Sequence, residues 1–208
     1  MGRIDESGAV LTDDEMYTNP DVAIKFIQET GVDALAVSYG STHGDYPEGY
    51  VPTFHFDIVE KIKAATGAPL VLHGGSGAGE ENMRRSVEAG INKINVDTDI
   101  RLAVTRNMRE LFEREPELKE SSLAGVWQLL DEKREQFDPR AFLPPVYDLV
   151  MYGTVADEAQ EKLVAAIEAG VKEAVGTLIV QFGSYGKAPL VKIATLDEMA
   201  ERYAKEGR

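Results

Sequence analysis

Three short polar clusters in this chain contain residue types that could bind a metal ion or an anion. Imidazole nitrogens are good zinc ligands, and backbone N–H groups at the start of a helix bind anions. Each cluster follows an apolar run, at the strand end where parallel α/β folds place their chemistry. The clusters are Ser41–His43, His73–Ser76 and Asn95–Asp99. We therefore expect a functional site at one edge of a parallel sheet.

The histidines are the first candidates for metal binding, because the chain contains no cysteine and only three histidines. His73 ends one apolar run and His43 follows the preceding one, so the two rings could lie side by side above neighbouring strands. Two imidazoles suit Zn²⁺, and a catalytic site would require a third ligand. His55 lies between Phe54 and Phe56 at the start of a helical pattern, which predicts a surface or packing role.

The stretch "HGGSG" at 73–77 predicts an anion site next to that metal site. Glycines let backbone N–H groups approach an anion closely, and the helix predicted from about Glu80 adds its positive N-terminal end. The stretch is not a nucleotide-binding P-loop, since no Gly-Lys-Ser/Thr follows it. A phosphate group is the ligand that this loop favours.

Lys93 offers a second mechanism. It shares strand parity with Asn95 and Asp97, so its amine should point to the same side of the sheet. A lysine there could form a Schiff base with a carbonyl substrate, or could simply pair with a carboxylate. The two histidines make metal chemistry the favoured alternative.

Composition excludes several classes of protein. The 208 residues include 36 acidic and 22 basic ones, and the formal net charge of −14 disfavours nucleic acid and anionic membranes as partners. Hydrophobic residues make up 43% of the chain, which is enough for the core of one domain over 1–208. There is no apolar run of about 18 residues, and the N-terminus lacks the layout of a signal peptide. We expect a cytoplasmic protein.

Strands and helices should alternate over about 32–115, which indicates βαβ units and a parallel sheet. A helix over 19–31 should precede them, with Asn19 as its cap and Pro20 at its first position. The predicted strands are 32–40, 68–75 and 91–99, and the predicted helices between and after them are 54–66, 80–90 and one ending near 115.

Only helices are predicted after this region. C-terminal helices should occupy 116–175, in particular 123–137 and about 153–175, with a proline-rich connection at 138–145. The tail over 176–208 gives an ambiguous pattern.

The ordered motifs resemble those of the class II, zinc-dependent fructose-1,6-bisphosphate aldolases, a family that includes tagatose-bisphosphate enzymes. The resemblance covers most of residues 17–188 and implies a (β/α)8 TIM barrel. Reversible cleavage of a ketose bisphosphate to dihydroxyacetone phosphate and an aldehyde is the implied reaction. The matching stretches are "GVDALAVSYGSTHGDYP", "PLVLHGGSG", "INKINVDTD", "DPRAFL" and "FGSYGKA".

The resemblance also implies roles for individual residues. His43 and His73 match zinc ligands, and a monovalent cation is implied near the phosphate site. Arg140 resembles an arginine that reaches a neighbouring subunit's site and holds the far phosphate, which implies a homo-oligomer. The lysine at the Lys93 position is not a Schiff-base residue in the family. The positions that match substrate-binding residues are Gly44, Gly74, Gly75, Ser76, Asn95, Val96, Asp97, Thr98 and Arg140.

The chain departs from the family's pattern in its N-terminal part. A complete barrel has eight strands and about 250 residues, whereas three strands are predicted here. No histidine precedes His43, and the family's proton-transferring aspartate has no match, so the catalytic acid–base residue is unknown. Asp5 or Glu6, in "MGRIDESG", could match the family's acidic pair.

We therefore expect the C-terminal half to two-thirds of such an aldolase, either a truncated or mis-started reading frame or one half of a split enzyme. Alone, it should have negligible aldolase activity and weak zinc affinity. Fructose and tagatose bisphosphate are both possible substrates. A non-catalytic phosphosugar-binding half-barrel that needs a partner chain is the alternative from another functional class.

Overall fold

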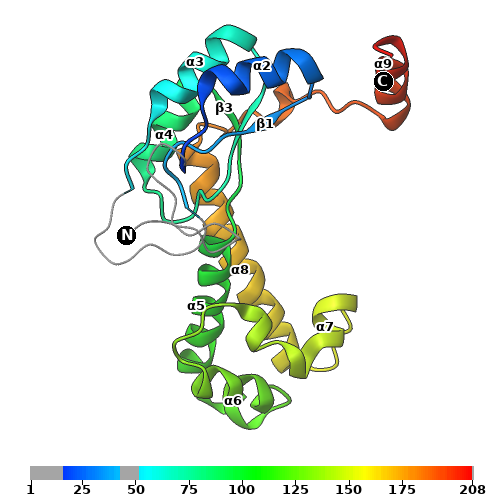
Figure 1. Ribbon diagram of the computed structural model, residues 1–208. Helices are drawn as coiled ribbons and strands as arrows, with labels where there is room; N and C mark the ends of the chain where they lie inside the picture. The colour runs from blue at the N-terminus through cyan, green and yellow to red at the C-terminus, as the bar shows by residue number, and fades with distance from the viewer. Residues whose placement is uncertain (1–15, 43–51, 208) are drawn as a thin grey trace, which may run out of the picture.

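The computed structural model describes residues 16–42 and 52–207, which form an α/β part and a helical part (Figure 1). The α/β part contains a small sheet with helices packed on it. The helical part extends from this sheet as a pair of long helices with shorter helices at the far end. Two separate hydrophobic clusters correspond to these two parts.

The sheet is parallel, as predicted, with its three strands in the order β1-β2-β3. The strands are β1 (Leu35–Ala36), β2 (Leu70–Leu72) and β3 (Ile91–Ile94), each shorter than predicted. Single hydrogen bonds extend the pairing, such as that from the Asn95 N–H to the Leu72 carbonyl at 2.9 Å. Each predicted strand therefore contains an observed strand and part of the loop that continues from it.

Three helices cover one face of the sheet: α2 (Pro20–Thr30), α3 (Phe56–Thr66) and α4 (Glu80–Ala89). α2 begins as predicted, with the Asn19 side chain accepting hydrogen bonds from two N–H groups of its first turn. Leu70 and Leu72 are fully buried against these helices, while Val71 between them is half-buried. This alternation shows that the two leucines point to the helical side of the sheet.

The helical part is organised around α5 (Thr98–Arg114) and α8 (Glu158–Gln181), which run side by side in opposite directions (Figure 1). They come close at Gly170, where an added Cβ atom would lie 2.8 Å from the Ala103 carbonyl oxygen. Phe112, Leu123 and Phe142 are fully buried in the core of this part. Glycine is thus required where the two backbones approach.

Some of the helix bounds predicted for the C-terminal region were wrong. The predicted helix 123–137 ends at Glu132, and the one expected over 153–175 starts after the cap Asp157 and continues to Gln181. The ambiguous tail contains α9, capped by Thr195. The shorter elements are η1 (Pro116–Glu120), α6 (Ala124–Glu132), η2 (Pro139–Ala141), η3 (Pro144–Val146), α7 (Tyr147–Tyr152), η4 (Ala188–Leu190) and α9 (Leu196–Lys205).

Among the helices of the described residues, each is too short or too polar to cross a membrane.

Candidate active site

A cavity of about 460 Å³ opens at the carboxyl ends of β2 and β3. Among the described residues, its lining comes from the second and third polar clusters of the sequence, together with Ile94 at the end of β3. The lining residues are His73, Gly74, Ser76, Ile94, Asn95, Val96, Asp97 and Thr98. The structure therefore brings two of the three predicted clusters together.

The first cluster is only partly described. Ser41 lies beside the cavity, where its hydroxyl donates a 2.6 Å hydrogen bond to the carbonyl oxygen of His73. This bond links the end of β1 to the end of β2. His43 and Gly44, together with Asp5 and Glu6, lie outside the described residues.

The His73 ring is held by a short hydrogen-bonded row on the face of the sheet opposite the helices. Asn95 Nδ2 lies 3.0 Å from His73 Nδ1 and 3.2 Å from Nε2, so the amide can donate to the ring nitrogen that lacks a proton. Lys93 Nζ donates to Asn95 Oδ1 and thereby fixes which end of the amide faces His73. This confirms that Lys93 and Asn95 point to the same side of the sheet. The partner of Lys93 is this amide oxygen rather than the carboxylate that the sequence suggested.

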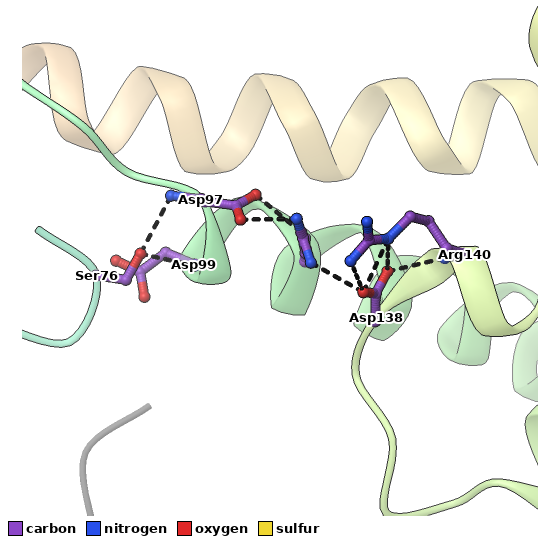
Figure 2. Close-up of polar contacts among 6 residues, drawn as sticks. Ser76, Asp97, Asp99, Asp138 and Arg140 are labelled. Atoms are coloured by element: carbon purple, nitrogen blue, oxygen red, sulfur yellow. Dashed lines mark hydrogen bonds and ion pairs between the residues drawn. The ribbon is translucent and has the colours of Figure 1, made fainter. Parts of the chain in front are cut away.

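The glycine-rich loop is joined to the start of α5 through Ser76, which is buried. Its hydroxyl oxygen accepts hydrogen bonds of 3.3 Å from the backbone N–H groups of Asp97 and Asp99 (Figure 2). The N–H of Gly75 donates to the Asn95 carbonyl oxygen at 3.0 Å, and a Cβ atom on Gly75 would lie 2.8 Å from Ile94 Cγ2. A glycine is therefore needed at position 75 to bring the loop against β3.

Asp97 begins a row of ion pairs that leads away from the cavity. Its carboxylate accepts from Arg101, whose guanidinium also donates to Asp138 at 2.8 Å (Figure 2). Asp138 in turn binds the guanidinium of Arg140. The structure thus places Arg140 outside the cavity lining, on η2, with a side chain that is 74% exposed.

These contacts change the pKa of Asp138. The hydrogen bond from the Arg140 side chain, its backbone N–H and the nearby Arg101 charge lower the pKa of Asp138 from 3.8 to about 2. Asp138 is therefore a carboxylate at any physiological pH. Sequence reasoning missed Arg101. Its signal was the i, i+4 spacing from Asp97 at the start of a predicted helix.

The described residues do not form a complete metal site. No group of three or more His, Asp or Glu side chains among them is close enough to hold an ion. In the part of the chain that the structure describes, His73 is the one imidazole in the cavity lining, while the His55 ring packs on Tyr17 with ring centroids 4.3 Å apart. The packing role predicted for His55 is confirmed. A zinc centre on His73 would need His43 and a further ligand from beyond the described residues.

Comparison with known proteins identifies the family. Residues 1–187 match the family described as "Fructose-bisphosphate aldolase class-II". A fructose-bisphosphate aldolase of Rhizobium meliloti (strain 1021) is 30% identical over 91% of this chain and 49% of its own length. The corresponding enzyme of Geobacillus stearothermophilus is 33% identical over 68% of this chain and 42% of its own length. The chain thus spans about half the length of the curated relatives that it matches.

Solved structures agree on the fold. The YdjI aldolase from Escherichia coli K12 is 26% identical, with a TM-score of 0.51 over 83% of this chain and 48% of its own. A fructose-bisphosphate aldolase from Campylobacter jejuni has a TM-score of 0.54 over 83% of this chain and 47% of its own, at 21% identity. The three-stranded parallel sheet and its helices are consistent with part of a TIM barrel. The chain belongs to the class II fructose-bisphosphate aldolases, a family of lyases.

Proposed function

We propose that this chain forms the phosphate-binding part of a class II ketose-bisphosphate aldolase site. The complete site would cleave fructose 1,6-bisphosphate reversibly to dihydroxyacetone phosphate and glyceraldehyde 3-phosphate. The observation that supports this proposal best is the cavity in which the Gly74–Ser76 loop faces the Asn95–Thr98 segment. A reaction in carbohydrate metabolism and a cytoplasmic location follow from the same proposal.

The phosphate of dihydroxyacetone phosphate would bind between the glycine loop and the first turn of α5. The dipole of α5 adds positive potential there, while the N–H groups of Asp97 and Asp99 donate to Ser76 and hold the loop against this turn. Local attraction is needed because the chain carries a net charge of −14. Among the described residues, Lys93 is a cation that donates to a residue of the cavity lining, Asn95.

The carbon skeleton of the substrate would lie toward His73 and Asn95. Asn95 is oriented by Lys93, so its amide has a fixed direction in the cavity. We propose that Asn95 and Asp97 contact substrate hydroxyls and that Arg140 binds the far phosphate at a neighbouring subunit's site, in a dimer or larger assembly. Proton transfer needs a group that we assign to no residue of this chain.

Zinc belongs to this proposal only as an ion that His43 and His73 would ligate. The described residues supply one imidazole and do not fit a complete zinc centre. A monovalent cation next to the phosphate completes the expected set of ions. Tagatose 1,6-bisphosphate is the alternative substrate.

A second candidate function is binding of a phosphosugar without catalysis, by a half-barrel that pairs with another chain. The observation in its favour is the sheet face opposite the helices. On that face Ala36 and Lys93 are exposed and Val71 is only half-buried. A barrel would cover this face with its remaining strands.

Binding of dihydroxyacetone phosphate, measured by isothermal titration calorimetry on the full chain, tests the proposed site. We expect Ser76→Ala to weaken binding by about tenfold, because the loop loses its link to α5. Ser184→Ala, an exposed serine in the tail, is the matched control and should bind like the wild type. Equal affinities for Ser76→Ala and the wild type would contradict the site.

Catalysis requires a separate assay, because the chain can bind substrate without completing the reaction. We expect negligible cleavage of fructose 1,6-bisphosphate by this chain with added Zn²⁺. Zinc-dependent turnover that EDTA abolishes would show that the chain alone is a complete aldolase. Phosphate binding without turnover is expected of both candidate functions, and turnover that appears when a partner chain is added would distinguish the first from the second.

A further inference from the structure

One face of α5 carries polar residues at every fourth position, starting from the cavity. Residues four apart lie on the same side of a helix. Each of these side chains makes hydrogen bonds, and three of them bond to the segment 133–138, which follows α6. The four residues are Asp97, Arg101, Thr105 and Arg109.

Thr105 and Arg109, the two of these residues farthest from the cavity, hold the backbone of the segment 133–138. The Thr105 hydroxyl donates to the Phe137 carbonyl oxygen. Nη2 of Arg109 donates to three further carbonyl oxygens, at 3.3, 2.7 and 3.0 Å, those of Lys133, Arg134 and Gln136. The chain between α6 and η2 is thereby fixed along α5 without regular secondary structure.

Arg101 connects Asp97, at the cavity, to Asp138, which caps η2. Its Nε and Nη2 lie 2.8 and 2.7 Å from the two carboxylate oxygens of Asp97, and its Nη1 donates to Asp138 at 2.8 Å. A planar guanidinium can serve two carboxylates at once, whereas a lysine ammonium is a single point of charge. The Arg101 side chain is 29% exposed, which limits the screening of both pairs by water.

Asp138 also binds Arg140. The Asp138 carboxylate accepts from the backbone N–H of Arg140 and from its Nε, each at 3.0 Å. Because Asp138 is itself held by Arg101, the exposed Arg140 guanidinium has a defined place relative to the glycine loop (Figure 2). The row from Ser76 to Arg140 is continuous.

We propose that Arg101 is a positioning residue that holds Asp97 at the cavity and, through Asp138, holds Arg140 where it binds the far phosphate in a neighbouring subunit's site. The inference depends on the proposed function for the role of Arg140 in substrate binding. Arg101 itself touches no substrate. It links, along α5, the loop that binds one phosphate in this chain's own site to the arginine that reaches the neighbouring subunit's site.

The ratio of two affinities tests this role. Isothermal titration calorimetry on the full chain would compare fructose 1,6-bisphosphate with dihydroxyacetone phosphate, which has one phosphate. We expect Arg101→Leu to reduce the preference for the bisphosphate by about tenfold, since only the second phosphate needs Arg140. Arg106→Leu is the matched control: Arg106 lies on α5 but pairs with Glu173 of α8 at 2.7 Å.

A second measurement is independent of substrate binding. Arginine side-chain ¹⁵N NMR reports how fast the Nε proton of Arg140 exchanges with water, with Arg140→Lys used to assign the signal. We expect slow exchange in the wild type and in Arg106→Leu, and exchange at least about fivefold faster in Arg101→Leu. Asp138→Asn should accelerate exchange in the same way.

The outcomes separate the inference from the proposed function. An unchanged bisphosphate preference in Arg101→Leu, or an unchanged Arg140 exchange rate, would overturn the positioning role. If the wild type binds neither compound, the proposed function fails, and the exchange rates alone decide whether Arg101 positions Arg140. If general destabilisation were the cause, both affinities would fall equally and the preference would stay constant.

Discussion

The two parts of the molecule differ in how completely they bury their own surfaces. In the helical part, α5, α6 and α8 enclose a core that contains Phe112 and Phe142, both fully buried. In the α/β part, helices cover only one face of the sheet. The other face presents Lys93 and the cavity with His73.

This difference suggests that stability and ligand binding depend on different parts of the molecule. The helical part has the features of a closed core, and its polar side chains mainly tie segments together. The α/β part leaves its polar strand ends accessible on the side where a barrel has its interior. We therefore expect substitutions in the helical core and on the covered sheet face to affect stability. Substitutions on the open face should affect ligand binding.

The largest expected effect is that of Phe112→Ala. Phe112 is fully buried and packs on Trp127, with ring centroids 5.5 Å apart. Removing it should lower the free energy of unfolding by about 3–5 kcal/mol. Urea unfolding followed by fluorescence measures this, because Trp127 is the single tryptophan of the chain. Phe26→Ala, at a side chain that is 45% exposed, is the control and should have a small effect. Similar losses for both would contradict a closed helical core.

Two adjacent residues of β2 test the comparison within the sheet. Leu72→Ala should lower the free energy of unfolding by about 2–5 kcal/mol, because Leu72 is fully buried under the helices. Val71→Ala should lower it by about 1 kcal/mol or less, since Val71 is half-buried on the open face. Urea unfolding followed by far-UV circular dichroism gives both values. Equal losses would show that both faces are covered in solution.

The sequence predicted the α/β part better than the helical part. Alternation of apolar strands with amphipathic helices depends on local patterns, and Asn19 with Pro20 located the start of α2 correctly. The end of α6 at Glu132 depends on Arg109, which binds the carbonyl groups that follow from a distant helix. Such tertiary contacts leave no local pattern, so the predicted helix continued too far.

The candidate site shows the same division. The "HGGSG" and "NVDTD" stretches predicted which strand ends meet, and the cavity lining confirms their proximity. The ion pairs that join Arg101 to Asp138 could not be predicted, because they connect residues far apart in the sequence. The roles of His43 and Gly44 stay predictions, since both lie outside the described residues.

The contact between α5 and α8 gives a prediction in which two similar changes have opposite signs. Gly170→Ala should lower the free energy of unfolding by about 1–3 kcal/mol, because the new Cβ would lie 2.8 Å from the Ala103 carbonyl oxygen. Gly176→Ala lies in the same helix with no atom within 4 Å of its new Cβ. It should raise the free energy of unfolding by about 0.5–1 kcal/mol through better helix propensity. Chemical denaturation of the two variants checks the signs, and a gain for Gly170→Ala would rule out the close approach.

A small effect that depends on pH is expected from the row of ion pairs that joins the two parts. The pKa of Asp138 is lowered from 3.8 to about 2, so its carboxylate stabilises the folded chain at pH values above its unfolded pKa. This contribution is lost as the pH falls from about 4 toward about 2. Asp138→Asn should therefore lower the free energy of unfolding by about 1 kcal/mol at about pH 5, and by progressively less below about pH 4.

Urea unfolding of Asp138→Asn and the wild type at a series of pH values measures the gap between the two curves. Other carboxyl groups whose pKa is lowered, such as those of Asp157 and Glu198, affect both proteins equally and cancel in the difference. Little or no gap at any pH would mean that Asp138 acts only as the cap of η2, because an asparagine side chain can cap equally well. A gap that closes with acid would tie it to the charge that Arg101 and Arg140 share, and so to the link between the open and closed parts of the molecule.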